Sequence, residues 1–240
     1  MTTTPVSIAA RARTVDLTVA AAHLVVALAH VTVAIGGASI VLPVALSLSG
    51  AAPAAFAGVD LAAAAAVVLL CSVAARVAAA VSPERRTGIR ALELSQVSGI
   101  SLFLVAQLNG VAEAGALILC YAIAAAAIGV LWVQGSAPIE QRRSAWPYSA
   151  GAAIAIVPWG VVALYQVVGL AVGVPPALIV RVLTIVLLVL AAALWWIERR
   201  WQLGLITDPR AELLRTAVTL GTGIALLVLA VGLARPSALL

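Results

Sequence analysis

The sequence predicts an all-α membrane protein, folded as one bundle of seven transmembrane helices. Apolar residues make up 64% of the 240 residues and charged residues only 10%, which is far from the balance of a soluble domain. The apolar residues gather in runs of the length that a bilayer requires. Only short polar segments separate these runs, and none is long enough to fold alone. We therefore expect a single domain over residues 1–240.

Seven apolar segments are expected to cross the membrane. The fifth contains Pro158 near its middle, where a proline kinks a helix. Residues 37–57 are apolar but are interrupted by Gly, Pro and Ser. This pattern favours a β-like hairpin or a re-entrant cap on the outer surface over an eighth span. The predicted spans are residues 14–36, 58–81, 90–110, 112–134, 147–171, 177–197 and 211–234.

The arginines predict the orientation of the bundle. All 14 basic residues are Arg, and most lie in the N-terminal tail or in the loops after spans two, four and six. The opposite side has only Arg181 and Arg235. Cytoplasmic segments carry the excess of basic residues, so we expect a cytoplasmic N-terminus, an outer C-terminus and no nucleic-acid partner. The inner arginines are Arg11, Arg13, Arg85, Arg86, Arg90, Arg142, Arg143, Arg199, Arg200 and Arg210.

The third span contains the first candidate site residue, Glu93. A carboxylate within a membrane span is costly, and it usually faces the bundle interior with a partner. At about 100° per residue, Gln96 and Gln107 fall on the same side of the helix as Glu93. The third span is therefore expected to present a polar stripe, with one acid near its inner end.

Spans one and two add polar residues at a similar depth. Asp16, His23 and His30 are spaced by seven residues, which places them on one helix face. His30 is expected to be a core histidine with a hydroxyl or backbone partner, whereas both a core role and a site role stay open for His23. Ser72 lies one turn before Arg76. The Arg76 guanidinium either reaches the inner surface or pairs with Glu93.

Two interpretations of Glu93, Arg76 and His23 stay open. Together they form either a salt bridge that locks three helices or a proton- or ligand-linked site. The spans contain too few acids for a proton relay across the membrane, which argues against a pump or channel. We find no metal-ligand spacing, phosphate loop or G-x-S-x-G motif, so neither an enzyme nor a metal site is expected. Cys71 and Cys120 are expected to be buried thiols rather than a disulfide.

Several stretches together resemble the heliorhodopsin family. Each stretch is short, but their order and spacing match over nearly the whole chain. The resemblance implies that family's inverted topology, with the N-terminus inside, and a homodimer. The matching stretches are RALELS at 90–95 (third helix), WPYSAG at 146–151 with Pro158-Trp159 (fifth helix), Asp16 with His23 (first helix) and Leu42–Ser47 (outer hairpin).

The resemblance implies roles for individual residues. Glu93 matches the family's counterion to the retinal Schiff base. His23 and Ser72 match members of its inner polar cluster, and Trp159 matches a residue of its chromophore pocket. Arg76 stands where the family has a second histidine, so a titratable imidazole is replaced by a permanent cation.

The seventh span departs from the family at the residue that binds retinal. When the stretch is aligned on Glu212, Gly223 occupies the lysine position, and the chain contains no lysine. A Schiff base needs a primary amine, which Arg does not supply. We therefore expect no covalently bound retinal, and we expect Arg76 to replace the lost cation beside Glu93. The residues expected to line the pocket are Trp159, Gln96, Thr219, Thr222 and Gly223.

These observations lead to one expected function and two alternatives. The expected protein is heliorhodopsin-like, has no covalent chromophore and has a non-catalytic ligand-binding, sensory or regulatory role. The first alternative is a light-responsive protein that holds retinal or a carotenoid non-covalently. The second is an accessory subunit of a transporter or membrane enzyme on the same scaffold. The expected partners are the lipid bilayer, a second copy of the chain, and an apolar small molecule or a membrane protein.

Overall fold

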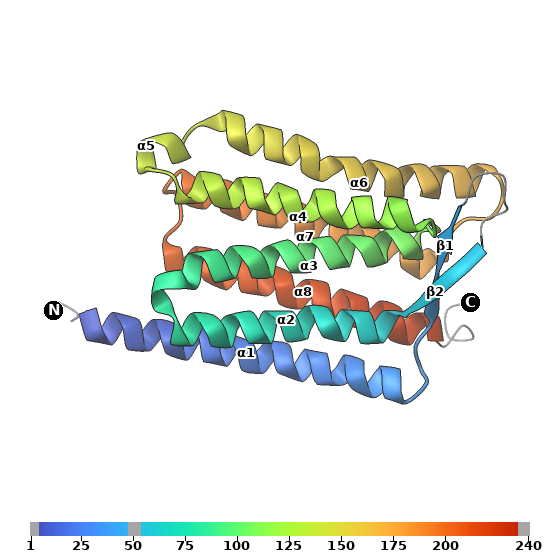
Figure 1. Ribbon diagram of the computed structural model, residues 1–240, viewed down its shortest axis with the longest axis horizontal. Helices are drawn as coiled ribbons and strands as arrows, with labels where there is room; N and C mark the ends of the chain where they lie inside the picture. Colours follow the sequence, from blue (N-terminus) through green and yellow to red (C-terminus); the bar gives the residue numbers. More distant parts are fainter. Residues whose placement is uncertain (1–4, 48–53, 235–240) are drawn as a thin grey trace.

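The computed structural model describes residues 5–47 and 54–234, and its helices run side by side along the long axis of the molecule (Figure 1). Seven of the described helices are long and apolar enough to cross a membrane, which confirms the predicted class. The elements are α1 (Pro5–Ile35), β1 (Val41–Leu46), β2 (Ala54–Asp60), α2 (Leu61–Val81), a 3₁₀ turn (Pro83–Arg85), α3 (Arg86–Leu108), α4 (Ala114–Ser136), α5 (Ile139–Arg142), α6 (Ala145–Ala171), α7 (Leu178–Gln202) and α8 (Asp208–Ala234).

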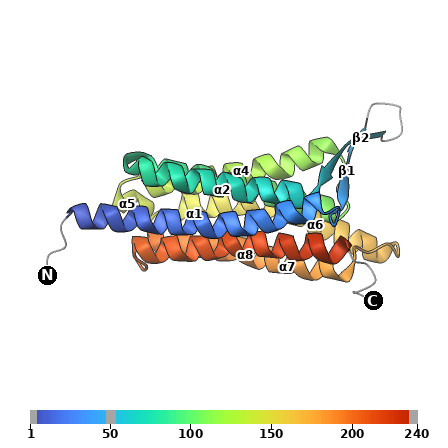
Figure 2. The same ribbon diagram turned by 90° about the horizontal axis from the view of Figure 1, so that it is seen from below.

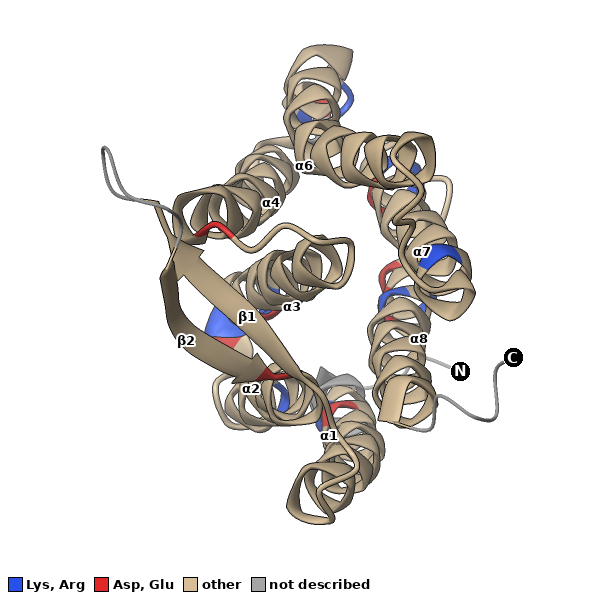
Figure 3. Cartoon of the chain, turned by 90° about the vertical axis from the view of Figure 1, so that its right-hand side faces the viewer, with Lys and Arg blue, Asp and Glu red and all other residues tan. Residues whose placement is uncertain are grey.

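The seven long helices form a closed ring. Each packs against its neighbours in chain order, and α8 returns to pack against both α1 and α2. Seen along the bundle axis, α3 lies closest to the centre of the ring (Figure 3). Because α3 also contacts α2, α4, α6, α7 and α8, its polar side chains have access to most of the other helices.

The two ends of the bundle differ in charge. The start of α1 and the loops α2–α3, α4–α6 and α7–α8 lie at the left in Figure 1, and we call this the basic end. The β1–β2 hairpin lies at the opposite, hairpin end. The described inner arginines therefore gather at one end, as their sequence positions predict, and Arg181 lies near the other. Arg235 lies outside the described residues.

Several predicted boundaries differ from the structure. The first helix begins at Pro5, nine residues before the predicted span, because helical hydrogen bonding continues into the polar segment that was expected to be a tail. The second helix begins at Leu61, since residues 58–60 belong to β2. The sixth span continues to Gln202. Hydropathy predicts how much of a helix fits the hydrocarbon core, and the helix itself extends beyond it.

The segment between α1 and α2 confirms the predicted hairpin, which projects from the bundle in Figure 2. Its strands pair antiparallel, with a register shift at Val44/Ala45. Ala45 N donates to the Ala112 carbonyl at 2.7 Å, and Gln107 Nε2 donates to the Pro43 carbonyl at 3.2 Å. Asp60 then caps α2 by accepting a hydrogen bond from Ala63 N at 2.7 Å, as a helix N-terminus requires. Gln107 of the predicted polar stripe therefore anchors the hairpin.

Two apolar clusters fill the bundle. The larger lies in the half toward the hairpin and joins β1 to α2, α3, α4, α7 and α8. The smaller lies toward the basic end, between α3, α4, α7 and α8. Most of the polar residues discussed next lie on the other side of α3 from α4, between α1, α2, α3 and α8, and one pair joins α8 to α7. Members of the smaller cluster are Leu94, Ile128, Leu131, Leu194, Ile197, Ala211 and Val218.

Candidate functional site

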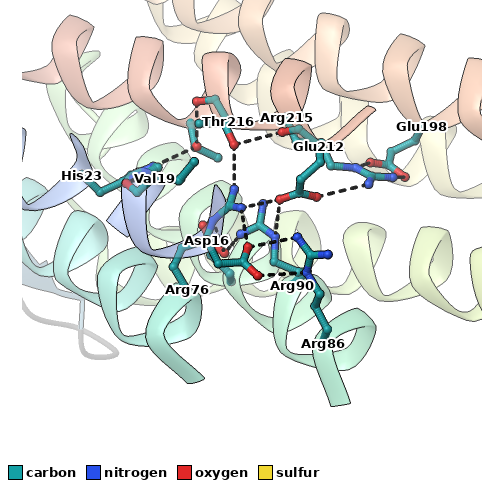
Figure 4. Close-up of polar contacts among 12 residues, drawn as sticks. Asp16, Val19, His23, Arg76, Arg86, Arg90, Glu198, Glu212, Arg215 and Thr216 are labelled. Carbon is teal, nitrogen blue, oxygen red and sulfur yellow. Dashed lines mark hydrogen bonds and ion pairs between the residues drawn. The ribbon is translucent and has the colours of Figure 1, made fainter. Parts of the chain in front are cut away.

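Arg76 of α2 lies at the centre of a buried ion cluster (Figure 4). Its side chain is fully buried, and it contacts acids from three other helices. Nη1 lies 3.3 Å from Asp16 Oδ1 on α1 and also pairs with Glu212 on α8, while Nε lies 3.5 Å from Glu93 Oε2 on α3. The predicted pairing of Arg76 with Glu93 is present, but Glu93 is one of three acids that share this guanidinium.

Two further arginines of α3 extend the cluster toward the basic end. Arg90 pairs with Glu93 one turn along its own helix and, through Nε at 2.9 Å, with Glu212 Oε1. Arg86 contacts both carboxylate oxygens of Asp16: its Nε lies 3.1 Å from Oδ2, and its Nη2 donates to Oδ1 at 3.1 Å. Both arginines were expected to be topological signals at the membrane boundary. In the folded protein Arg90 is only 6% exposed.

The cluster ends at a pair between α7 and α8. Arg215 donates from Nη2 to Glu198 Oε2 at 2.9 Å, and its Nη1 lies 3.6 Å from Glu212 Oε2. Its guanidinium also lies over the Trp201 ring, 4.9 Å from the centroid. The ion cluster therefore has equal numbers of arginines and acids, which balances its charge. Its members are Asp16, Arg76, Arg86, Arg90, Glu93, Glu198, Glu212 and Arg215.

His23 joins the ion cluster through two threonines of α8. Its Nδ1 donates to the Val19 carbonyl at 2.9 Å, and its Nε2 lies 3.0 Å from Thr219 Oγ1. The Thr219 hydroxyl oxygen also lies 3.1 Å from the Thr216 carbonyl, and the Thr216 hydroxyl accepts from Arg76 Nη2 at 2.8 Å. The structure thus connects His23 to Arg76 through the polar groups of Thr219 and Thr216, without direct contact.

Gly223, which the alignment places where the family has its retinal-binding lysine, is closely packed. A Cβ atom at Gly223 would lie 2.8 Å from Leu69 Cδ2 on α2. The Gly223 carbonyl accepts a hydrogen bond from His30 Nε2 at 3.0 Å. His30 is fully buried, in agreement with its expected role as a core histidine with a backbone partner. Ser72 is also buried, one turn before Arg76, and its hydroxyl has no hydrogen-bond partner among the described residues.

A small cavity lies where the chromophore pocket was expected. It has a volume of about 70 Å³, and we call it the mid-span cavity. Trp159, Thr219 and Thr222, three of the residues expected at the pocket, line it. Gln96 does not, because its side chain turns toward α4 and accepts a hydrogen bond from the Tyr121 hydroxyl at 2.8 Å. Gly223 also lies outside the lining.

Several members of the ion cluster were not recognised as site residues from the sequence. Asp16 was placed on the polar face of span one but given no partner, Glu212 was used in the alignment with the family, and Glu198 and Arg215 lie near predicted span ends. The sequence did contain a signal for the members on α8. Polar residues recur there at the three- and four-residue spacing of one helix face, at Glu212, Arg215, Thr216 and Thr219. No three His, Cys, Asp or Glu side chains in the described part of the chain are placed to hold a metal ion.

The fold and the cluster define a seven-helix membrane protein of the rhodopsin-like class, with ionisable side chains buried among five helices. Comparison with known families makes the assignment specific. The family model described as Heliorhodopsin matches residues 13–198, and the chain belongs to the heliorhodopsin family. The match includes Asp16, His23, Arg76 and Glu93, and ends before α8. A search of curated proteins gave no match.

Proposed function

We propose that this protein is a non-catalytic sensory or regulatory member of the heliorhodopsin family that carries no covalently bound retinal. The observation that carries the proposal is the environment of Gly223, at the position of the family lysine. This backbone is pressed against Leu69 and hydrogen-bonded to His30, so the site of attachment is occupied by protein. The absence of lysine from the sequence removes the alternative of attachment elsewhere through a lysine side chain.

The size of the mid-span cavity argues against a chromophore that is held without a covalent bond. Pockets that enclose ligands of this size class have volumes of about 300–1,000 Å³, whereas the mid-span cavity has about 70 Å³. Retinal or a carotenoid would enter only if Trp159 and its neighbours moved apart. The light-responsive alternative therefore has weaker support than the leading proposal.

Arg76 supports the same proposal through charge. In the family, as the resemblance implies, the equivalent of Glu93 balances a protonated Schiff base. Here Arg76 lies 3.5 Å from Glu93 and contacts Asp16 and Glu212 as well. The permanent positive charge of Arg76 thus compensates the negative charge of the buried carboxylates. The ion cluster joins α1, α2, α3, α7 and α8 and gives the bundle a fixed inner half.

The proposal includes a cytoplasmic basic end and a homodimer. The described arginines outnumber the acids at the basic end, which the positive-inside rule assigns to the cytoplasm. The homodimer follows from the resemblance to the family. A transporter subunit has weaker support, because the described charged residues of the interior gather in one half of the bundle.

The test is a reconstitution with all-trans-retinal. The protein is purified from cells grown with and without retinal, beside a lysine-containing heliorhodopsin as the positive control. Absorbance spectra and mass spectrometry of an organic extract are then recorded. We expect no visible band and no stoichiometric retinoid or carotenoid in this protein, and both in the control. A stoichiometric retinoid with a visible band would contradict the proposal, and ion or solute flux in proteoliposomes would favour the transporter alternative.

A further inference from the structure

A second and larger cavity lies at the basic end, away from the mid-span cavity. It has a volume of about 610 Å³ and lies between α1, α3, α4, α7 and α8. We call it the basic-end cavity. This volume falls within the range of about 300–1,000 Å³ that encloses small organic ligands. The basic-end cavity therefore has room for a molecule far larger than any that would fit the mid-span cavity.

One part of the basic-end cavity is apolar. Its wall on α4 and α7 includes Leu131, Trp132 and Trp201. Leu94, Ile128 and Leu194 line both the basic-end cavity and the mid-span cavity, so they form a floor between the two. A hydrocarbon chain directed at this floor would be surrounded by aliphatic and indole groups, and burial of apolar surface would favour its binding.

The other part of the basic-end cavity carries guanidinium groups. Arg86, Arg90 and Arg215 line it. Arg90 is only 6% exposed. Its Nη1 pairs with Glu93 and its Nε lies 2.9 Å from Glu212 Oε1, whereas its Nη2 makes no hydrogen bond to a described residue. A buried donor without a protein partner requires an acceptor, which water or a ligand in the cavity would supply.

The acids of the cavity wall are already engaged. Glu198 accepts two hydrogen bonds from Arg215. Asp208 accepts one from the Trp201 indole at 2.6 Å, and Glu212 is shared by Arg76, Arg90 and Arg215. A guanidinium has five N–H donors and a carboxylate about four acceptor sites. The wall therefore has donors in excess, and these match a ligand with acceptor oxygens.

The charge around the cavity favours an anionic group. At the basic end the described arginines exceed the acids, which produces a positive potential that attracts anions. The arginines are Arg13, Arg76, Arg85, Arg86, Arg90, Arg142, Arg143, Arg199, Arg200, Arg210 and Arg215, and the acids are Asp16, Glu84, Glu93, Glu140, Glu198, Asp208 and Glu212.

We propose that the basic-end cavity binds a single-chain amphiphile with an anionic head group. The head accepts hydrogen bonds from Arg90 and its neighbours Arg86 and Arg215, and the hydrocarbon chain lies on Leu94, Ile128 and Leu194. This inference deepens the proposed function and rests on it, because it names the ligand class of a member of the family that holds no retinal.

The test uses protein in nanodiscs of zwitterionic phosphatidylcholine and measures quenching of tryptophan fluorescence. The probe is undecanoate brominated at its terminal carbon, since Trp132 and Trp201 line the cavity and bromine quenches nearby indoles. The matching brominated undecanol tests the need for the anion, and brominated butanoate tests the need for the chain. We expect saturable quenching by the undecanoate, with affinity at least about tenfold weaker for each of the other two probes.

Two variants test the location of the site. Ala91→Phe places a phenyl ring in the cavity, because Ala91 lines it, and should abolish saturable quenching. Ala126→Phe, at an exposed position on α4, is the matched control and should bind as the parent does. Arg90→Gln should weaken binding about tenfold to a hundredfold, as expected for loss of hydrogen bonds from a charged group.

Three results would overturn the inference: equal affinity for the undecanoate and the undecanol, equal affinity for the butanoate, or unchanged quenching in Ala91→Phe. The readout is independent of the retinal test. Protein that binds no retinal and no amphiphile would contradict this inference alone. A visible retinal band would contradict the proposed function, whatever the amphiphile does.

Discussion

Arg76 and Glu93, on neighbouring helices and both shielded from solvent, form an ion pair with 3.5 Å between Nε and Oε2. The same guanidinium also contacts Asp16 and Glu212. One cation from α2 thus serves three carboxylates from three other helices. Its removal would leave several buried charges without compensation.

The first prediction concerns this cation. Arg76→Ala should destabilise the protein by about 3–5 kcal/mol, the cost of breaking a buried ion pair from one side. For a chain of this size the melting temperature should fall by roughly 10 °C, measured by thermal shift in detergent. Arg85→Ala, at an exposed position of the same end, is the control and should shift it little. Equal melting temperatures for the two variants would show that Arg76 does not hold the cluster together.

The second prediction concerns Gly223, which is aligned with the family lysine. Gly223→Ala should destabilise the protein by about 1–3 kcal/mol, because its Cβ would meet Leu69 Cδ2 at 2.8 Å and overpack the interface of α2 and α8. Gly221→Ala is the matched control on the same helix, since its Cβ would lie 3.4 Å from Leu190 Cδ2. This variant should be neutral or gain up to about 1 kcal/mol from helix propensity.

Thermal unfolding of the two glycine variants measures the difference. If Gly223→Ala were as stable as Gly221→Ala, the bundle would have free space beside Leu69, and the argument that protein fills the attachment site would fail.

The third prediction concerns a polar contact at the hairpin end. Asn109, the C-cap residue of α3, donates from Nδ2 to Thr184 Oγ1 at 3.0 Å and accepts from Gln166 Nε2 at 2.7 Å. It therefore links α3 to α6 and α7. A double-mutant cycle with Asn109→Ala and Gln166→Ala should give a coupling energy of about 1 kcal/mol. The control cycle pairs Gln166→Ala with Arg85→Ala at the opposite end and should be additive. Additivity in both cycles would count against the link.

The fourth prediction concerns orientation. In a background where Cys71 and Cys120 are replaced by serine, Arg143→Cys and Val174→Cys place single thiols at exposed positions of opposite ends. A membrane-impermeant maleimide added to intact cells should label the cysteine at position 174 and leave the one at 143 unlabelled until the cells are opened. The reverse pattern would place the basic end outside, against the positive-inside rule.

Much of the fold followed from local properties of the sequence. Apolar runs of bilayer length gave the seven spans, and Gly, Pro and Ser between residues 37 and 57 gave the hairpin. The errors were at helix ends, as in α1, which begins at Pro5. Hydropathy does not report where backbone hydrogen bonding continues beyond the hydrocarbon.

The candidate site was predictable only in part. The spacing of Asp16, His23 and His30 placed them on one buried face, which is where the structure has them. Gln96 was assigned to the pocket because it shares a side of α3 with Glu93. In the structure the Gln96 side chain points toward Tyr121 of α4 instead. Two residues on the same side of a helix can still contact different neighbouring helices, because their side chains project in slightly different directions.

The sequence by itself determined the class, the spans, the absence of lysine and the presence of a cation at position 76, because these are properties of single residues and of local periodicity. Only the tertiary structure decided that Arg76 reaches three acids, that Leu69 fills the space beside Gly223, and that the larger cavity lies at the basic end. These features depend on how each helix is rotated about its own axis and on how side-chain volumes fit between helices. Both are fixed by packing among residues far apart in the chain, which no local pattern records.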